Sequence, residues 1–168
     1  SSTLDLSEVL RAFTDQAMEL TGATAAEISF WDRDRDSLVM LVEHQEGANE
    51  ITEEGGQAYR LSDYPATRQV LETQEPIQIR VSNENDDPAE RALLESRGHN
   101  PLLMLPLILR GETLGMMEVI DTADREFDAA DVDFCQALCN VVAPAVQNAM
   151  LYAEMKELAA RDKLTGLY

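Results

Sequence analysis

Three side chains between residues 61 and 73 could form a small binding site. Arg68 carries a planar guanidinium that suits a carboxylate or a phosphate, and Tyr64 and Thr67 lie within four residues of it. If this segment covers the open face of a sheet, the three side chains point inward toward other strands. The predicted ligand-binding residues are Ser29, Trp31, Tyr64, Thr67, Arg68, Leu103 and Leu105. The alternative is a surface arginine over a filled core, and the sequence identifies neither a ligand nor a cofactor.

The other residues capable of chemistry form no recognisable catalytic or metal site. Cys135 and Cys139 lie one helical turn apart without a neighbouring histidine, which makes a poor zinc site and favours packing. His44 and His99 are expected at a strand edge or on the surface. The spacing of the acids in 32–36 resembles a calcium loop, but a serine occupies the position of the required glycine, so we predict a hairpin turn. No nucleophile, base and orienting group form a series, and catalysis is not expected.

The elements that position these residues follow from the hydrophobic periodicity. It predicts four helices, 6–20, 66–73, 89–97 and 129–161, and Asp5 and Glu8 are placed like a capping pair at the start of the first. It predicts five strands, 27–31, 38–42, 76–81, 102–109 and 113–121, and a polar loop over 46–57. This order predicts an α+β fold with a central antiparallel sheet flanked by helices, one face of the sheet being free to line a pocket.

The last predicted helix is long and carries a second apolar pattern. Pro144 removes one backbone donor within it, so a bend is expected there. Beyond the bend the apolar stripe consists of Leu151, Met155 and Leu158, which are spaced by four and then three residues. This spacing suits the seam of two paired helices. We therefore predict a homodimer that pairs through these residues.

Composition excludes several classes of partner. The chain has 168 residues, 32 acidic and 13 basic, with a formal charge of 13 − 32 = −19, and 45% of its residues are hydrophobic, which fits one domain with a core. Because no stretch is basic, nucleic acid and anionic membranes are poor partners. Two cysteines and no apolar run near 20 residues indicate a cytoplasmic protein without direct membrane contact. The chain begins without methionine and is expected to be part of a longer protein.

Five fragments in order resemble a GAF domain, a small sensory module of signalling proteins. They are Leu61-Ser-Asp-Tyr-Pro-Ala-Thr-Arg68 with Val70-Leu71, Leu103-Met-Leu-Pro-Leu107, Leu114-Gly115, Arg125-Glu-Phe127 with Asp131, and Ala143-Pro-Ala-Val-Gln-Asn-Ala149 with Leu151-Tyr152. The resemblance covers about 4–155. It implies a GAF-like, PAS-related sensory domain over 1–150, and a small-molecule pocket on the sheet.

The final residues resemble the start of a GGDEF domain, the diguanylate cyclase module that makes cyclic di-GMP. Asp162, Leu164 and Thr165-Gly-Leu167 match the opening D-x-L-T-G-L motif of that family. The resemblance implies a signalling helix over 151–161 and the beginning of a GGDEF domain over 162–168. The cyclase residues would lie beyond 168, so this chain should make no cyclic di-GMP, although its parent protein is expected to be a diguanylate cyclase.

Two ligands known for GAF domains fit this sequence poorly. In the cyclic-nucleotide pattern, Asp121-Thr122 stand where Asn-Lys is expected, and Val132 replaces a glutamate, although Phe127 is present. Bilin-binding relatives attach the pigment through a cysteine near the pocket, whereas Cys135 and Cys139 fall on the last helix. The resemblance therefore implies a GAF module for an unidentified ligand.

Three functional hypotheses remain open. In the first, the module senses a small molecule and changes the geometry of paired terminal helices. In the second, the pocket is occluded and the domain serves only as a dimerisation spacer. In the third, the domain is a redox enzyme that reduces methionine sulfoxide, which requires exposed reactive cysteines near the pocket.

Overall fold

The computed structural model describes residues 3–47 and 58–165. Its sheet has six strands in the order β3-β2-β1-β6-β5-β4, and each neighbouring pair is antiparallel. The strands are β1 (Ala25–Asp32), β2 (Ser37–Gln45), β3 (Ala58–Arg60), β4 (Ile77–Ile79), β5 (Leu102–Leu109) and β6 (Glu112–Ile120). The helices of the described residues are α1 (Thr3–Thr21), α2 (Pro65–Thr73), α3 (Pro88–Arg97) and α4 (Ala129–Thr165), with a 3₁₀ turn η1 (Leu61–Asp63). The predicted fold class, an antiparallel sheet flanked by helices, is confirmed.

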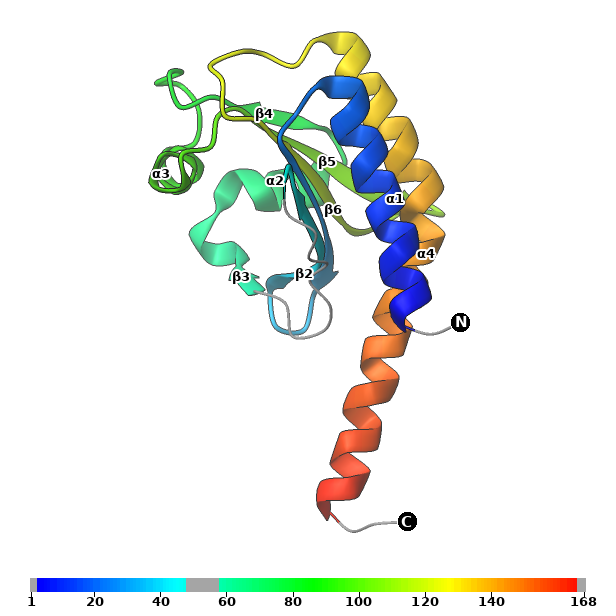
Figure 1. The fold of residues 1–168 in the computed structure, drawn as a ribbon. Coiled ribbons are helices and arrows are strands. Elements are labelled where there is room, and N and C mark those ends of the chain that lie inside the picture. Colours follow the sequence, from blue (N-terminus) through cyan, green and yellow to red (C-terminus); the bar gives the residue numbers. More distant parts are fainter. Residues whose placement is uncertain (1–2, 48–57, 166–168) are drawn as a thin grey trace.

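The two faces of the sheet carry different layers. Helices α1 and α4 lie side by side on one face, and α2 and α3 lie on the other (Figure 1). We call these the helix face and the pocket face. The helix face buries an apolar cluster that includes Leu10, Ile28, Val42, Leu103, Leu105, Met117, Val119, Cys139, Val142 and Val146. The pocket face buries a second cluster that includes Leu38, Leu61, Val70, Leu71, Ile79, Leu94, Leu102, Met104, Met116 and Ile120.

Most element boundaries agree with the sequence prediction. Strand β5 has the predicted bounds, and α3 begins one residue earlier than predicted, at Pro88. The short β3 was not predicted because three residues show no alternation. The proposed cap at the first helix is wrong, since Asp5 is already helical within α1. The predicted loop 46–57 lies mostly outside the described residues.

Gly115, in the middle of β6, has a packing role. A Cβ atom at this position would lie 2.0 Å from the backbone oxygen of Ser29 and 2.8 Å from the Cα of Phe30. Both atoms belong to β1, the strand that pairs with β6. Glycine therefore permits the close approach of the two central strands.

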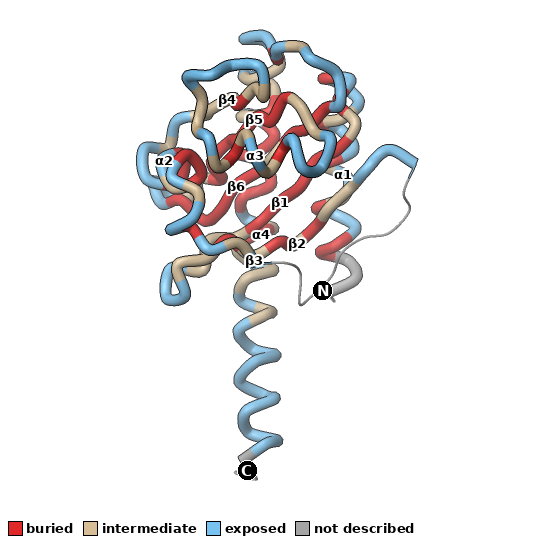
Figure 2. Tube along the Cα trace, turned by 90° about the vertical axis from the view of Figure 1, so that its left-hand side faces the viewer, coloured by how far each residue is buried: buried red, intermediate tan, exposed pale blue. Residues whose placement is uncertain are grey.

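Helix α4 is continuous through Pro144, and its ribbon changes direction in the orange segment (Figure 1). Its first half packs on the sheet, whereas its second half extends away from the domain and is largely exposed (Figure 2). By length and composition alone, 129–164 could cross a membrane, although no apolar run of such length was predicted. The same composition is required of a core helix, and Cys139, Val142 and Val146 are buried against the sheet.

Candidate functional site

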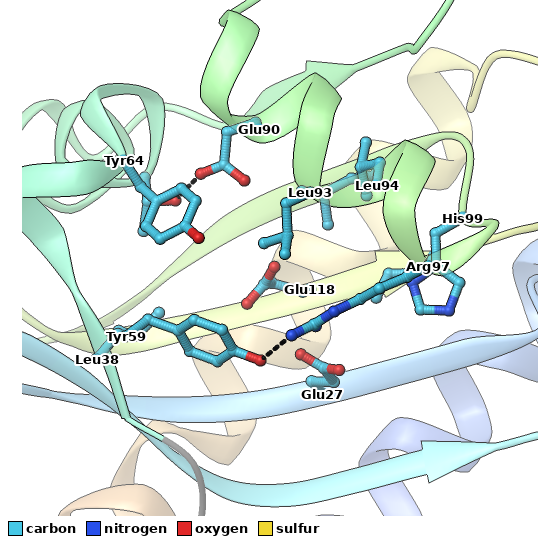
Figure 3. Close-up of a pocket in the computed structure, with 13 residues that line it drawn as sticks. Glu27, Leu38, Tyr59, Tyr64, Glu90, Leu93, Leu94, Arg97, His99 and Glu118 are labelled. Carbon is cyan, nitrogen blue, oxygen red and sulfur yellow. Dashed lines mark hydrogen bonds between the residues drawn. The ribbon is translucent and has the colours of Figure 1, made fainter.

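A small cavity lies on the pocket face, beneath α2 and α3 (Figure 3). Its volume is about 40 Å³, which leaves room for a few water molecules. The strands contribute Glu27 (β1), Leu38 (β2), Tyr59 (β3), Leu102 (β5), and Glu118 and Ile120 (β6). The helices contribute Thr67 (α2) and Glu90, Leu93, Leu94 and Arg97 (α3). Tyr64 precedes α2 and His99 follows α3, and both also line the cavity. Elements that are far apart in sequence therefore converge on one site.

The floor of this cavity carries an unusual row of carboxyl groups. Glu27 of β1 pairs directly with Glu118 of β6 and, on its other side, with Glu43 of β2. Like charges at directly opposite strand positions destabilise a sheet. Within the described residues, the carboxyl groups of Glu27 and Glu118 have neither a hydrogen bond nor an ion pair. The row therefore weakens the fold at this point.

Burial changes the protonation of these acids. The pKa of Glu27 is raised to about 7, chiefly by burial and also by the charge of Glu43, while the positive charge of Arg97 opposes the change. Burial also raises the pKa of Glu118 well above its ordinary value, with contributions from Glu27 and Glu90. The carboxyl groups on the floor therefore take up protons more readily than an exposed glutamate does.

Arg97 spans the mouth of the cavity. It is the last residue of α3, and its side chain reaches past the carboxyl groups of Glu27 and Glu118 toward β3 (Figure 3). Its Nη2 donates a hydrogen bond to the hydroxyl of Tyr59 at 2.9 Å, and its guanidinium carbon lies 5.5 Å from the centre of the tyrosine ring. This contact joins α3 to β3 over the cavity.

A buried hydrogen bond joins the two helices that cover the site. The hydroxyl of Thr67 on α2 donates to a carboxyl oxygen of Glu90 on α3. Burial raises the pKa of Glu90, and the bond from Thr67 opposes this change. Asp87 fixes the start of α3, because its side chain accepts hydrogen bonds from the backbone N–H groups of Ala89 and Glu90 at 2.8 and 3.1 Å.

The structure brings two of the seven predicted ligand-binding residues into the cavity, Tyr64 and Thr67. Ser29 is buried on β1 and does not line it. Trp31 lies farther along β1, packed against the core of the pocket face, with the guanidinium of Arg33 4.1 Å from its ring centre. Arg68 lies outside the cavity, where it donates to Asp36 at 2.5 Å.

Leu103 and Leu105, which were predicted to line the pocket, lie on the helix face. Their neighbours on β5, Leu102 and Met104, lie on the pocket face. Because almost every residue of β5 is apolar, its sequence does not show which alternate residues face which layer. The sequence prediction therefore assigned Leu103 and Leu105 to the wrong face of the sheet.

Sequence reasoning missed the charged residues of the cavity. Glu27 and Glu118 each interrupt a strand that is otherwise mostly apolar. A charged residue within a central strand is a signal, because such residues are seldom buried. Arg97 and Glu90 gave no comparable signal, since charged residues are ordinary on a short helix.

A family model described as a GAF domain matches residues 3–147. This chain belongs to the GAF domain family. A search of curated proteins gave no match.

Solved structures share the fold of this GAF domain. The phycoerythrobilin-bound GAF domain of a cyanobacterial phytochrome is 16% identical, with a TM-score of 0.72 and 89% of each chain covered. A GAF domain/HD domain protein from Geobacter sulfurreducens is 17% identical, with a TM-score of 0.67, covering 89% of this chain and 96% of that one. The GAF domain of a two-component sensor histidine kinase from Bacillus halodurans is 13% identical, with a TM-score of 0.68 and coverage of 86% and 95%.

The two cysteines of this GAF domain lie across the sheet from the cavity. Cys135 and Cys139 are buried on α4, within the core of the helix face. Burial raises the pKa of Cys135 to about 12, and it also raises the pKa of Cys139. Both are therefore thiols rather than reactive thiolates at neutral pH.

The two histidines occupy different settings. His44 on β2 contacts the carboxylate of Asp15 on α1, whereas His99 lines the cavity. Burial and the nearby Arg97 lower the pKa of His99. Of the acids of 32–36, Asp34 and Asp36 lie in the predicted turn between β1 and β2, and Asp32 is the last residue of β1. The described residues contain no group of three or more side chains suited to a metal ion.

Proposed function

We propose that this GAF domain senses a small molecule in the cavity of the pocket face and transmits the signal through α4. In this proposal two cytoplasmic copies pair along the exposed half of α4, and the helix leads into a GGDEF domain that makes cyclic di-GMP. The observation that carries the proposal is the dual role of α4. One half forms the core beneath the sensing sheet, and the other half extends as an exposed apolar stripe.

The exposed stripe supports pairing with a second copy. Leu151, Met155 and Leu158 are 52%, 68% and 57% exposed. Val141, which is 66% exposed, lies two heptads before Met155. A second identical helix would cover this stripe.

Charge also favours this contact. Residues 148–161 contain two acids, Glu154 and Glu157, and two bases, Lys156 and Arg161, so their net charge is 2 − 2 = 0 in a chain of charge −19. The repulsion between two strongly acidic copies is therefore smallest along this part of α4.

The turn between β1 and β2 links the pocket face to α4. Asp36 in this turn pairs with Arg68 of α2 at 2.5 Å. The neighbouring Arg35 pairs with Glu157 of α4 at 3.0 Å. A ligand that shifts α2 can therefore change the contacts of the exposed helix through a single short turn.

The GGDEF part of the proposal depends on the last residues of the chain. Asp162, Leu164 and Thr165 of the motif are helical and continue α4 without a break, whereas 166–168 lie outside the described residues. The divisions 1–150, 151–161 and 162–168 therefore fall within or beyond one continuous helix, and they remain a prediction. The residues that follow Tyr168 in the gene test this part, because synthesis requires an intact G-G-[DE]-E-F loop.

Sedimentation velocity tests the pairing. We expect the wild-type chain to be a dimer and Met155→Glu to be a monomer, because a charge would be buried in the seam. Ala160→Glu is the matched control, since it adds the same charge to an exposed position off the stripe and should remain a dimer. A wild-type chain that stays monomeric at high concentration would contradict the proposal.

The occluded spacer is a second candidate. The small volume of the cavity, about 40 Å³, and the Arg97–Tyr59 hydrogen bond across it favour this candidate. It predicts that no small molecule changes the melting temperature. The redox enzyme is disfavoured because Cys135 and Cys139 are buried away from the cavity. A bilin, which the phytochrome relative binds, is far larger than this cavity, and neither cysteine lines it.

A further inference from the structure

The cavity contains more acid than base. Three carboxylic acids, Glu27, Glu90 and Glu118, line it, and Arg97 is the one permanently charged base among the described lining residues. Glu90 already accepts a hydrogen bond from Thr67. The excess of unpaired acid therefore lies at Glu27 and Glu118, on the floor.

Glu27 and Glu118 are placed to act together. They are directly opposite residues of β1 and β6, so their Cβ atoms are separated by about 5 Å. Glu27 is only 5% exposed, and its carboxyl group has neither a hydrogen bond nor an ion pair among the described residues. A buried carboxyl without a partner is costly, and an apolar pair at this position would be more stable. A ligand that donates hydrogen bonds to both groups would remove this cost.

Arg97 indicates the chemistry of such a ligand. Its guanidinium lies at the mouth of the cavity near both acids, and its charge favours their ionised forms. The residue itself is exposed and precedes Gly98, at the end of α3. Its side chain can therefore turn outward while the helix stays in place. Arg97 acts as an internal cation that a ligand of similar chemistry can replace.

We infer that the cavity binds a small organic cation with at least two N–H donors, an ammonium or a guanidinium group, which replaces Arg97 beside Glu27 and Glu118. This inference rests on the proposed sensing function and specifies its ligand class. Binding breaks the Arg97–Tyr59 hydrogen bond and so releases α3 from β3. It also expels protons, because a cation that donates hydrogen bonds to both carboxyl groups stabilises their ionised forms more than Arg97 does, whose hydrogen bond goes to Tyr59.

The inference differs from the anion site expected for Arg68. Arg68 lies outside the cavity and is paired with Asp36 and Glu72. Within the cavity, the acids outnumber the arginine, so an anion would meet net repulsion.

Isothermal titration calorimetry with methylguanidinium tests the inference. At pH 7.5 we expect saturable binding to the wild-type chain, whereas tetramethylammonium, a cation without N–H donors, should not bind. The measured heat should differ between HEPES and Tris buffers, because the buffer takes up the released protons. Equal heats in both buffers would show that the floor carboxyls do not ionise on binding and would overturn the inference.

Four variants locate the binding. Glu27→Gln and Glu118→Gln should each weaken binding about tenfold or more, through loss of a charge-assisted hydrogen bond. Arg97→Ala should strengthen binding, because it removes the internal competitor. Glu95→Gln, an exposed position on α3, is the control and should bind as the wild type does. The melting temperature of each variant confirms that it folds.

Two outcomes separate the inference from the proposed function. If acetate or phosphate binds in place of methylguanidinium, and Arg97→Ala abolishes that binding, the ligand class is wrong and the sensing function stands. If no probe binds, and native mass spectrometry of the purified chain shows no added mass, the inference fails and the spacer function is favoured. The dimer measured by sedimentation is independent of both outcomes.

Discussion

The helix face and the pocket face are built from the same strands, yet their chemistry differs. On β1, Ile28 packs into the apolar core beneath α1 and α4, whereas its neighbour Glu27 lies in the acidic cavity. On β6, Met117 and Glu118 show the same contrast. The helix face thus supplies apolar burial that stabilises the fold, whereas the pocket face also buries carboxyl groups whose ionised forms weaken it. Such local cost is typical of binding sites.

The largest expected effect is a loss of packing on the helix face. Leu105→Ala removes a fully buried side chain and should lower the free energy of unfolding by about 3 kcal/mol. Urea unfolding measures this change. Leu105→Met, which keeps the volume, should cost less than about 1.5 kcal/mol. If the alanine variant were as stable as the methionine variant, the dry core assigned to this face would be wrong.

A substitution on the pocket face should raise the free energy of unfolding instead of lowering it. The folded-state pKa of Glu27 is raised from 4.5 to about 7, so its protonated form stabilises the fold below pH 4.5 and that contribution is lost as pH rises through 7. Glu27→Gln, which mimics the protonated acid, should therefore exceed the wild type in stability at pH 8 by up to about 3 kcal/mol. At pH 4.5 the free energies of unfolding of the variant and the wild type should be similar.

Urea unfolding at several pH values measures this difference. Glu95→Gln is the control, because this side chain is exposed on α3, and it should follow the wild type at each pH. A Glu27→Gln variant less stable than the wild type at pH 8 would show that the carboxylate contributes to the fold instead of weakening it.

A smaller effect is expected from the cap of α3. Asp87→Ala removes the side chain that accepts from two backbone N–H groups and should cost about 1 kcal/mol. Because α3 packs only on the pocket face, amide hydrogen exchange should accelerate in 88–97 while 6–20 on the helix face stays protected. Equal acceleration on both faces would indicate that the two layers unfold as one unit.

The smallest effect on stability is expected at the turn that links the faces. Arg35→Ala removes exposed ion pairs with Asp32 and Glu157, and exposed pairs contribute little to stability. Its free energy of unfolding should match that of the wild type within error. The response of hydrogen exchange in 148–161 to methylguanidinium should nevertheless decrease, and molar salt should reproduce this decrease in the wild type. An unchanged response would exclude the turn as a route between the faces.

The sequence was informative where local pattern decides structure. The alternation of β6, the apolar run of β5, and the proline and glycine that bound α3 placed these elements within one residue of their observed bounds. Patterns of this kind depend on neighbours in the chain and are read without a fold. These patterns did not show which face of the sheet Leu103 and Leu105 occupy, because an apolar strand buried on both sides carries no alternation.

By itself, the sequence determined the α+β fold, the long final helix and its apolar spacing, since each follows from the order and periodicity of side chains. Only the tertiary structure decided which acids meet. Glu43, Glu27 and Glu118 become neighbours through the strand order β2-β1-β6 and its register, and Arg97 reaches them from α3. The strength of their interaction depends on separation and burial, which pairing between distant segments sets.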